Sequence, residues 1–250
     1  MPSLPLPDSN VVSIQQVEKK NLADRCLLML RAALPVNAYL LEGVAERAAG
    51  WSSCCFLDGG RVGGVAHLRS RAYLHLFLST RLSEPARREA VRYIDRSFSG
   101  MRALFGDRWS VEQFQRFSRL TPTRVQTFIA MEAVRGTFRP DMRYLCATAT
   151  PGQISSLGPL QVAYEIEEVG AGSGSINRRA VQAVLRRKAA RREISVVFRD
   201  GEAVAMAGVN ARFEDLCQIG SVYVVPSLRG MGYGTSVVSC HLIRLLRRYR

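Results

Sequence analysis

The chain has 250 residues, of which 47% are apolar and 22% are charged. This length gives room for one large domain or two small ones, and the apolar share excludes wholesale disorder because it is enough to build a core. No stretch reaches the roughly 18 uncharged apolar residues that span a bilayer. The start, MPSLPLPDSN, has neither the basic flank nor the apolar run of a secretory signal. We therefore expect a cytoplasmic protein with no membrane partner.

The net charge is +14, from 35 basic and 21 acidic residues, and only three of the basic residues are lysines. Residues 1–140 carry +8 and residues 141–250 carry +6, so the excess is spread evenly. The densest basic run is Arg186, Arg187, Lys188, Arg191 and Arg192. Nucleic-acid proteins more often concentrate charge in one stripe with interleaved aromatic residues. A solvated helix face is therefore favoured for the run, nucleic acid is not the expected partner, and the surplus charge suits a polyanionic small ligand.

Cysteine and histidine spacing predicts no metal site and no disulfide framework. The six cysteines contain no CxxC pair, and the three histidines complete no metal-ligand spacing. Free or buried thiols are the interpretation that remains.

In chain order, apolar spacing predicts helices over 22–34 and 39–49, then strands over 53–57, 62–68 and 73–78. The first two strands are separated by the tight-turn signal Asp58-Gly59-Gly60. A helix over 84–98, a short apolar segment at 101–105, a helix over 111–117 and a strand over 124–131 follow. This alternation indicates an α/β fold with a mixed sheet.

The second half repeats this order: a strand over 144–147, helices over 159–169 and 177–191, strands over 194–198, 203–209 and 218–225, and a helix over 233–249. Phe56, Asp58, Gly59 and Val62 match Phe198, Asp200, Gly201 and Val204 at a constant offset of 142. We therefore predict a duplicated fold with units at 1–140 and 141–250.

The most informative stretch is the segment RGMGYG, residues 229–234, which follows a strand ending at Pro226 and opens into an amphipathic helix. Glycines allow a tight turn with exposed N–H groups, and the helix start adds unpaired donors and a positive dipole end. Such a turn suits a pyrophosphate. The Gly-Lys-Ser/Thr of a nucleotide P-loop is absent, and so is a dinucleotide GxGxxG followed by an acidic residue.

The segment fits R-x-x-G-x-G/A with Arg229, Gly232 and Gly234 at the fixed places, and in this the chain resembles the GNAT superfamily of N-acetyltransferases. The resemblance covers about residues 141–250 and implies acetyl-CoA as co-substrate, with Tyr223, Val224 and Val225 pairing with the pantetheine arm and 230–235 holding the pyrophosphate. The implied cofactor-binding residues are Val222, Tyr223, Val224, Val225, Arg229, Gly230, Met231, Gly232, Tyr233, Gly234 and Thr235.

The resemblance also implies acetyl transfer to an amine, with the Val224 N–H as one stabiliser of the oxyanion. Gln218 stands where many family members have a glutamate base. Glu214 could act through water, although a turn residue is favoured there. Glu165 and Glu168 share one helical face near the expected acceptor site, where a solvated acidic face is the alternative. The acceptor is not identified by any of these residues.

Two departures from the family are expected to matter. The family continues past the motif helix with a strand, a tyrosine-bearing helix and further strands; 92 residues separate Asp58 from Thr150, but only 50 separate Asp200 from Arg250. The second unit is thus expected to be incomplete at its C-terminus, and an acetyltransferase that is inactive through this truncation is one of the alternatives left open. In the first unit, residues 79–85 contain no glycine and place Pro85 at the helix start, which predicts a degenerate unit.

Three functions therefore remain open from the sequence. An acyl-CoA-dependent N-acetyltransferase is the leading hypothesis. The alternatives are a non-catalytic module that binds acyl-CoA or a protein partner, and a basic nucleic-acid-binding protein.

Overall fold

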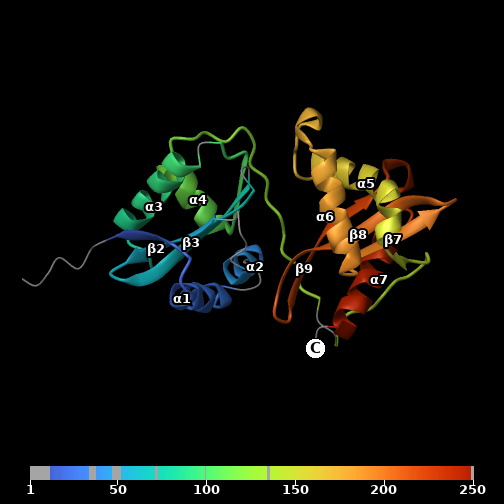
Figure 1. Ribbon diagram of the computed structural model, residues 1–250, viewed down its shortest axis with the longest axis horizontal. Coiled ribbons are helices and arrows are strands. Elements are labelled where there is room, and N and C mark those ends of the chain that lie inside the picture. Colours follow the sequence, from blue (N-terminus) through green and yellow to red (C-terminus); the bar gives the residue numbers. More distant parts are fainter. Residues whose placement is uncertain are drawn as a thin grey trace, which may run out of the picture. The chain divides into compact units, whose positions relative to one another are not determined.

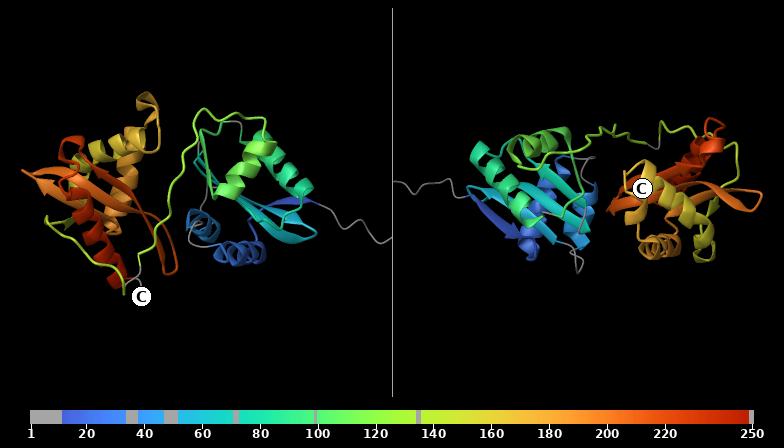
Figure 2. Two further views of the ribbon diagram at one scale, coloured as in Figure 1. Left: turned by 180° about the vertical axis from the view of Figure 1, so that it is seen from behind. Right: turned by 90° about the horizontal axis from the view of Figure 1, so that it is seen from above.

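The computed structural model of the chain describes residues 12–33, 38–46, 52–70, 73–98, 100–133 and 136–248 (Figures 1 and 2). The chain divides into two compact units, Met1–Met131 and Glu132–Arg250. Each unit has its own β-sheet with helices packed against it, so the predicted α/β class is confirmed. In the part of the chain that the structure describes, every helix is too short or too polar to cross a bilayer.

The first unit has a five-stranded sheet in the order β1-β2-β3-β4-β5, antiparallel except for the parallel pair of β4 and β5. Its elements are β1 (Ser13–Gln16), α1 (Lys20–Arg31), α2 (Ala38–Glu46), β2 (Ser52–Asp58), β3 (Arg61–Ser70), β4 (Tyr73–Leu78), α3 (Glu84–Ser97), β5 (Ala103–Gly106) and α4 (Arg108–Phe117).

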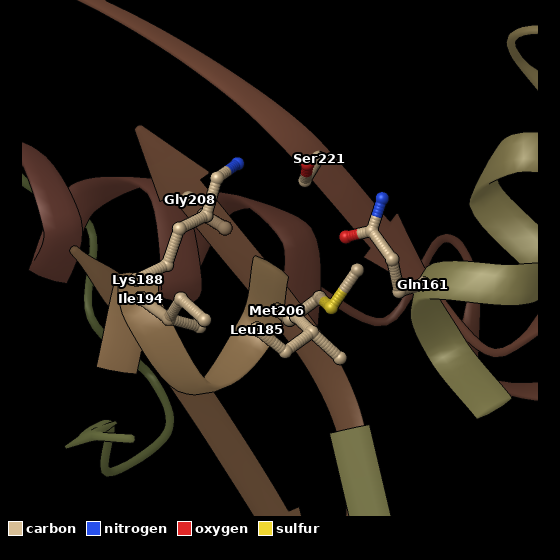
Figure 3. Close-up of a pocket in the computed structure, with 8 residues that line it drawn as sticks. Gln161, Leu185, Lys188, Ile194, Met206, Gly208 and Ser221 are labelled. Carbon is tan, nitrogen blue, oxygen red and sulfur yellow. The ribbon is translucent and has the colours of Figure 1, made fainter. Parts of the chain in front are cut away.

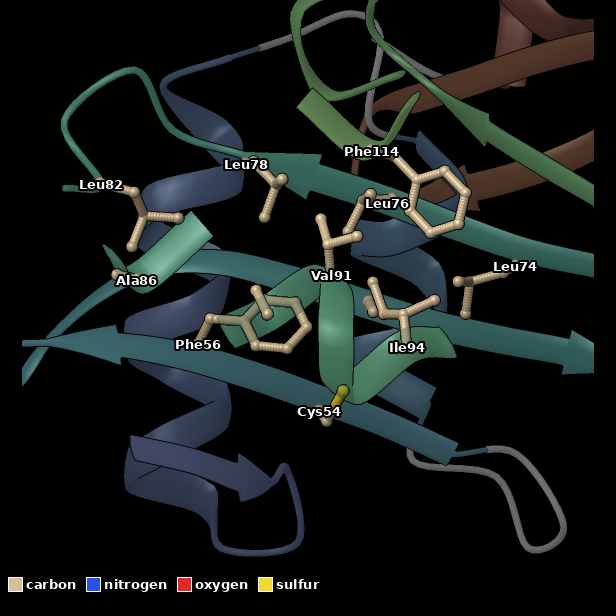
Figure 4. Close-up of a cluster of buried hydrophobic side chains, with 12 residues drawn as sticks. Cys54, Phe56, Leu74, Leu76, Leu78, Leu82, Ala86, Val91, Ile94 and Phe114 are labelled. Carbon is tan, nitrogen blue, oxygen red and sulfur yellow. The ribbon is translucent and has the colours of Figure 1, made fainter. Parts of the chain in front are cut away.

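The core of this unit lies between one face of the sheet and α3 (Figure 4). The period-2 alternation of β4 puts Leu74, Leu76 and Leu78 on that face, where they meet Val91 and Ile94 of α3. α1 and α2 contact β3 of the same sheet. The three leucines of β4 and the two α3 side chains that meet them are all at most 1% exposed. The amphipathic spacing that predicts α3 is therefore the spacing of its buried face.

The second unit has a four-stranded antiparallel sheet among the described residues, in the order β6-β7-β8-β9. Its elements are β6 (Ala147–Thr148), η1 (Pro151–Gln153), α5 (Ile154–Glu167), η2 (Ser173–Ser175), α6 (Arg178–Ala190), β7 (Ile194–Arg199), β8 (Glu202–Phe213), β9 (Leu216–Val224), η3 (Pro226–Leu228) and α7 (Tyr233–Arg248). Two separate apolar clusters pack on this sheet. One joins it to α5 and α6, and the other joins it to α7.

The hairpins β2–β3 and β7–β8 have the same geometry. Their four turn residues all have positive φ angles: Gly59, Gly60, Asp200 and Gly201. Both ladders also shift register at the same place, between Phe56 and Leu57 in the first and between Val197 and Phe198 in the second. Gly59 and Asp200 are 141 positions apart, as are Phe56 and Val197. The predicted offset of 142 is therefore wrong by one residue, because Asp58 lies outside the first turn.

Several other predicted elements differ from the structure. The expected strand over 124–131 does not form: this segment has no sheet partner among the described residues, and Ile129 and Met131 are 85% and 90% exposed. β6 is only two residues long, and α5 begins at Ile154 rather than at Pro159, which lies inside the helix. The predicted ends of the helices over 22–34, 39–49 and 233–249 lie outside the described residues.

Candidate functional site

The glycine-rich segment after β9 forms a turn that leads directly into α7. Gly230 and Gly232 have φ angles of 77° and 90°, which glycine adopts without the steric penalty of a side chain. α7 begins at Tyr233, and its first backbone bond runs from the Ser236 N–H to the Gly232 carbonyl. The N–H groups that precede Ser236 have no partner within the helix and form donors for an anion at its positive end.

This turn lines an open pocket of about 330 Å³. Six of the eleven residues predicted to bind the cofactor lie around it: Val224, Arg229, Gly230, Gly232, Gly234 and Thr235. The lining is completed by Leu228 and Arg143. The lining side chains include two arginines and no carboxylate, and each arginine pairs with a carboxylate outside the lining: Arg143 with Asp141 and Arg229 with Glu167. The exposed Arg143 guanidinium and the N–H groups of the turn are the donors that the pocket offers to an anionic ligand.

Arg143 is not among the residues predicted from the sequence. It lies in the segment before β6, whose backbone follows α7: the Arg143 N–H donates to Ser236 Oγ at 2.9 Å, and the Asp141 N–H donates to Ser239 Oγ at 3.1 Å. Its side chain is 65% exposed, with Nη2 3.3 Å from Asp141 Oδ2. A Cβ on Gly232 would lie 3.3 Å from Arg143 Cδ, so glycine makes room for this side chain. The contact spans about ninety residues of sequence and leaves no local signal.

The other five predicted residues do not line this pocket: Val222, Tyr223, Val225, Met231 and Tyr233. Tyr144 holds two of them in place. Its ring stacks on that of Tyr233 with centroids 3.8 Å apart, and its hydroxyl donates to the Met231 carbonyl at 3.0 Å. Tyr223 is buried in the cluster with α5 and α6. These contacts fix the backbone of the turn from outside the pocket.

Arg229 is engaged by a carboxylate of α5. Its Nη1 and Nη2 donate to the two Glu167 oxygens at 2.6 and 2.7 Å, and its Nε donates to the Val224 carbonyl at 3.1 Å. The hydrogen bond from Arg229 lowers the pKa of Glu167, and the hydrogen bond to Glu167 raises the pKa of Arg229. This fork ties the end of β9 to α5, so the guanidinium of Arg229 holds the turn at the pocket rim.

β9 lies at the edge of its sheet among the described residues, and its pairing with β8 decides which backbone groups face outward. The Val225 N–H donates to the Val204 carbonyl at 3.0 Å, and the next pair in register is Val224 with Ala205. Hydrogen-bonded and non-hydrogen-bonded pairs alternate along an antiparallel ladder, so Val224 directs its N–H and C=O away from β8. Of the three residues predicted to pair with a pantetheine arm, Val224 therefore offers its N–H to the open edge, whereas its carbonyl accepts Arg229 Nε.

The predicted carboxylates lie in three different settings. Glu165 is half-buried on α5 and accepts a hydrogen bond from Gln161 Nε2 at 2.8 Å. Glu168 follows the end of α5 and is exposed. Glu214 occupies the turn between β8 and β9 with a φ angle of 49°. Since a strand rises about 3.3 Å per residue, Glu214 lies at the far end of β9 from the pocket.

A second, smaller depression lies on the face of the sheet covered by α5 and α6 (Figure 3). Its floor is apolar, whereas Gln161, Lys188 and Ser221 bring polar atoms to its rim. Ser221 has a φ angle of 49° at a register shift of β9, and its hydroxyl donates to Asn210 Oδ1 at 3.2 Å. Desolvation raises the pKa of the neighbouring Tyr164, which keeps that phenol protonated.

Residues 164–248 match the model of the acetyltransferase (GNAT) family. No curated protein matches the chain. An acetyltransferase of the GNAT family from Colwellia psychrerythraea is similar over 94% of this chain and 86% of its own, with a TM-score of 0.50 and 14% identity. A tandem GNAT protein from the clavulanic acid biosynthesis pathway, solved without AcCoA, is similar over 96% of this chain and 87% of its own, with a TM-score of 0.53 and 14% identity.

The two structural likenesses extend over nearly the whole chain, and at 14% identity they show the fold. The family match covers the second unit from the last turn of α5 to the end of α7, and so includes the whole glycine-rich turn. The chain therefore has the fold of tandem GNAT proteins, and its residues 164–248 are similar to the acetyltransferase (GNAT) family.

Proposed function

We propose that the second unit binds acetyl-CoA and transfers its acetyl group to an amine. The observation that carries this proposal is the 330 Å³ pocket at the start of α7, which combines unpaired backbone donors, glycines and Arg143 at the end of an open strand edge. The match of residues 164–248 to the model of the acetyltransferase (GNAT) family supports the reaction class.

The residues around the turn fit a pyrophosphate. The backbone N–H groups of the first turn of α7 bind phosphate oxygens, and the helix dipole favours the negative charge. Arg143 lies beside Gly232 with an exposed guanidinium and adds charge-assisted hydrogen bonds. A side chain at Gly232 would press on Arg143 and fill part of this cradle.

The open edge of β9 fits the pantetheine arm as an added strand. The Val224 N–H faces that edge and can donate to a carbonyl or to the oxyanion that forms during acyl transfer. Acetyl-CoA supplies the thioester: the amine nitrogen bonds to its carbonyl carbon, the C–S bond breaks, and the amine proton passes to the thiolate. We propose that Glu165 and Glu168 contact the amine. Both lie beside Glu167, through which the end of α5 is joined to Arg229 at the pocket rim.

Calorimetric titration of the full chain with acetyl-CoA tests binding. Arg143→Gln is expected to weaken binding roughly ten- to hundred-fold, the usual worth of a charge-assisted hydrogen bond. Arg139→Gln is the matched control, because it removes the same charge from the same segment outside the pocket. Absence of binding, or equal losses in the two variants, would refute the site.

Turnover is measured separately, as thiol release from acetyl-CoA over a panel of primary amines. Release that depends on both the amine and Arg143 supports the transferase. Binding without release for any amine supports the alternative function, a non-catalytic acyl-CoA-binding module.

A further inference from the structure

A group of arginines gathers where the C-terminal ends of α6 and α7 meet. Arg244 Nη2 donates to the Arg192 carbonyl at 2.6 Å, and Arg248 Nη1 donates to the Arg191 carbonyl at 3.2 Å. We call this group the arginine cluster: Arg186, Arg187, Arg191, Arg192, Arg244, Arg247 and Arg248. Because the candidate pocket lies at the N-terminal end of α7, the cluster occupies the opposite end of that helix.

Two of these arginines have an evident structural role. Arg244 and Arg248 satisfy carbonyls just past the end of α6, where cations also complement the helix dipole, and Arg244 donates to Ser195 Oγ at 2.7 Å as well. The remaining five are exposed.

Among the described residues, no ion pair joins the five exposed arginines to a carboxylate. Elsewhere Arg88 pairs with Glu84, and Arg212 pairs with Glu193. α6 and α7 contain no acidic residue. Several like charges therefore face solvent at one place, and their mutual repulsion is relieved when a ligand supplies negative charges.

The surface around the cluster favours a phosphate backbone over a protein partner. Among the described residues of the second unit, the exposed large apolar side chains belong to neither α6 nor α7: Met142, Leu145, Ile166, Val222 and Met231. Protein interfaces centre on apolar and aromatic anchors, whereas a phosphodiester backbone is bound by charge and by the planar fork of arginine. We propose that the arginine cluster binds the phosphodiester backbone of nucleic acid without reading its bases.

This inference goes beyond the proposed acetyl transfer and revises an expectation from the sequence. The even spread of charge along the chain favours a solvated face for residues 186–192. Folding adds the three arginines of α7, which lie about fifty residues further on, and so concentrates charge that the linear order separates.

The test uses the full chain with a fluorescein-labelled uridine oligonucleotide of about 20 nucleotides, followed by anisotropy at several salt concentrations. The variant R187Q/R191Q is compared with R178Q/R179Q, which removes the same charge from the first turn of α6. We expect R187Q/R191Q to lower affinity roughly tenfold near 100 mM salt and to reduce the salt slope by about 2. R178Q/R179Q should bind like the unmodified chain.

Duplex DNA, phosphatidylserine vesicles and polyglutamate serve as the other arms. Binding of RNA or DNA that R187Q/R191Q weakens supports the proposal, provided that this variant keeps the unmodified thermal melt. Salt-insensitive binding, equal losses in both variants, or tighter binding of vesicles or polyglutamate than of either nucleic acid would overturn it.

Discussion

His241 on α7 is a buried imidazole that folds in its neutral form. It has no exposed surface, and its Nδ1 shares a hydrogen bond of 2.9 Å with Ser195 Oγ. Burial lowers its pKa from 6.5 to about 3, with the positive charges of Arg244 and Lys188 acting in the same direction. Protonation of His241 therefore opposes folding of the second unit.

This predicts a loss of stability in acid with a definite pH window. Between pH 6.5 and about 3 the unfolded chain binds a proton that the folded chain does not, so the free energy of unfolding falls as pH falls. From pH 7 to pH 5 the loss due to His241 should be about 2 kcal/mol. Urea unfolding at both pH values measures it. His241→Leu should lose correspondingly less over this interval, and equal losses in the two proteins would contradict the assignment.

At the scale of elements, residues 141–146 act as a strap along α7. Ser236 Oγ accepts the N–H groups of Arg143 at 2.9 Å and of Tyr144 at 3.4 Å, and Ser239 Oγ accepts that of Asp141 at 3.1 Å. Both serines are buried. The two hydroxyls therefore hold the strap against one face of α7. Because Arg143 is part of the strap, they also hold its backbone beside the pocket.

Removal of these hydroxyls should affect stability and ligand binding differently. Ser236→Ala leaves two N–H groups without their acceptor, and we expect it to cost about 1–3 kcal/mol in chemical denaturation. It should also weaken acetyl-CoA binding, since the backbone of Arg143 loses its anchor. Ser239→Ala removes one bond further from the pocket and should leave binding unchanged. Weaker binding in Ser239→Ala than in Ser236→Ala would show that the strap does not position Arg143.

Elements whose buried face repeats with a regular period could be predicted from the sequence. β4 matches its predicted bounds because its alternate residues are buried, and α3 shows the same agreement for helical spacing. The segment 124–131 is also rich in apolar residues, but no strand pairs with it in the part of the chain that the structure describes. Strand pairing is decided by the rest of the fold. Pro159 is tolerated inside α5 because Ile154 and Leu157 anchor the turn before it in the core.

The candidate site could be predicted as far as it is local in sequence. The glycine-rich turn was identifiable because glycine spacing and the helix start are adjacent along the chain. Arg143 and the fork between Arg229 and Glu167 depend on contacts between residues more than sixty positions apart, which no local pattern encodes.

At the scale of the whole molecule, the two units differ at equivalent backbone positions. Leu78 pairs with Gly64 in the first unit as Val224 pairs with Ala205 in the second, and the two partners are 141 residues apart. Leu78 is therefore the counterpart of Val224. Its N–H is not open to a ligand, because it donates to Ser110 Oγ at 2.7 Å.

At the start of α3 in the first unit, N–H groups that could bind a ligand are likewise either bonded within the chain or replaced by proline. The Ser83 N–H donates to Asp58 Oδ2 at 2.8 Å, and Pro85 brings no N–H to the first turn of α3. Residues 79–83 connect the strand to the helix in the first unit, whereas the longer segment 225–232 does so in the second. The Asp58 carboxylate thus occupies the helix start of the first unit, whereas in the second unit the corresponding place is left to a ligand.

We therefore predict one acetyl-CoA per chain. Calorimetric titration should give a stoichiometry near one, and Gly232→Ala should weaken that single event, because its Cβ presses on Arg143 in the second unit. Ser110→Ala frees the Leu78 N–H but leaves Asp58 on Ser83 and Pro85 in the helix, so its stoichiometry should stay near one. A second binding event in the unmodified chain, or one that survives Gly232→Ala at full affinity, would show that the first unit also holds the ligand.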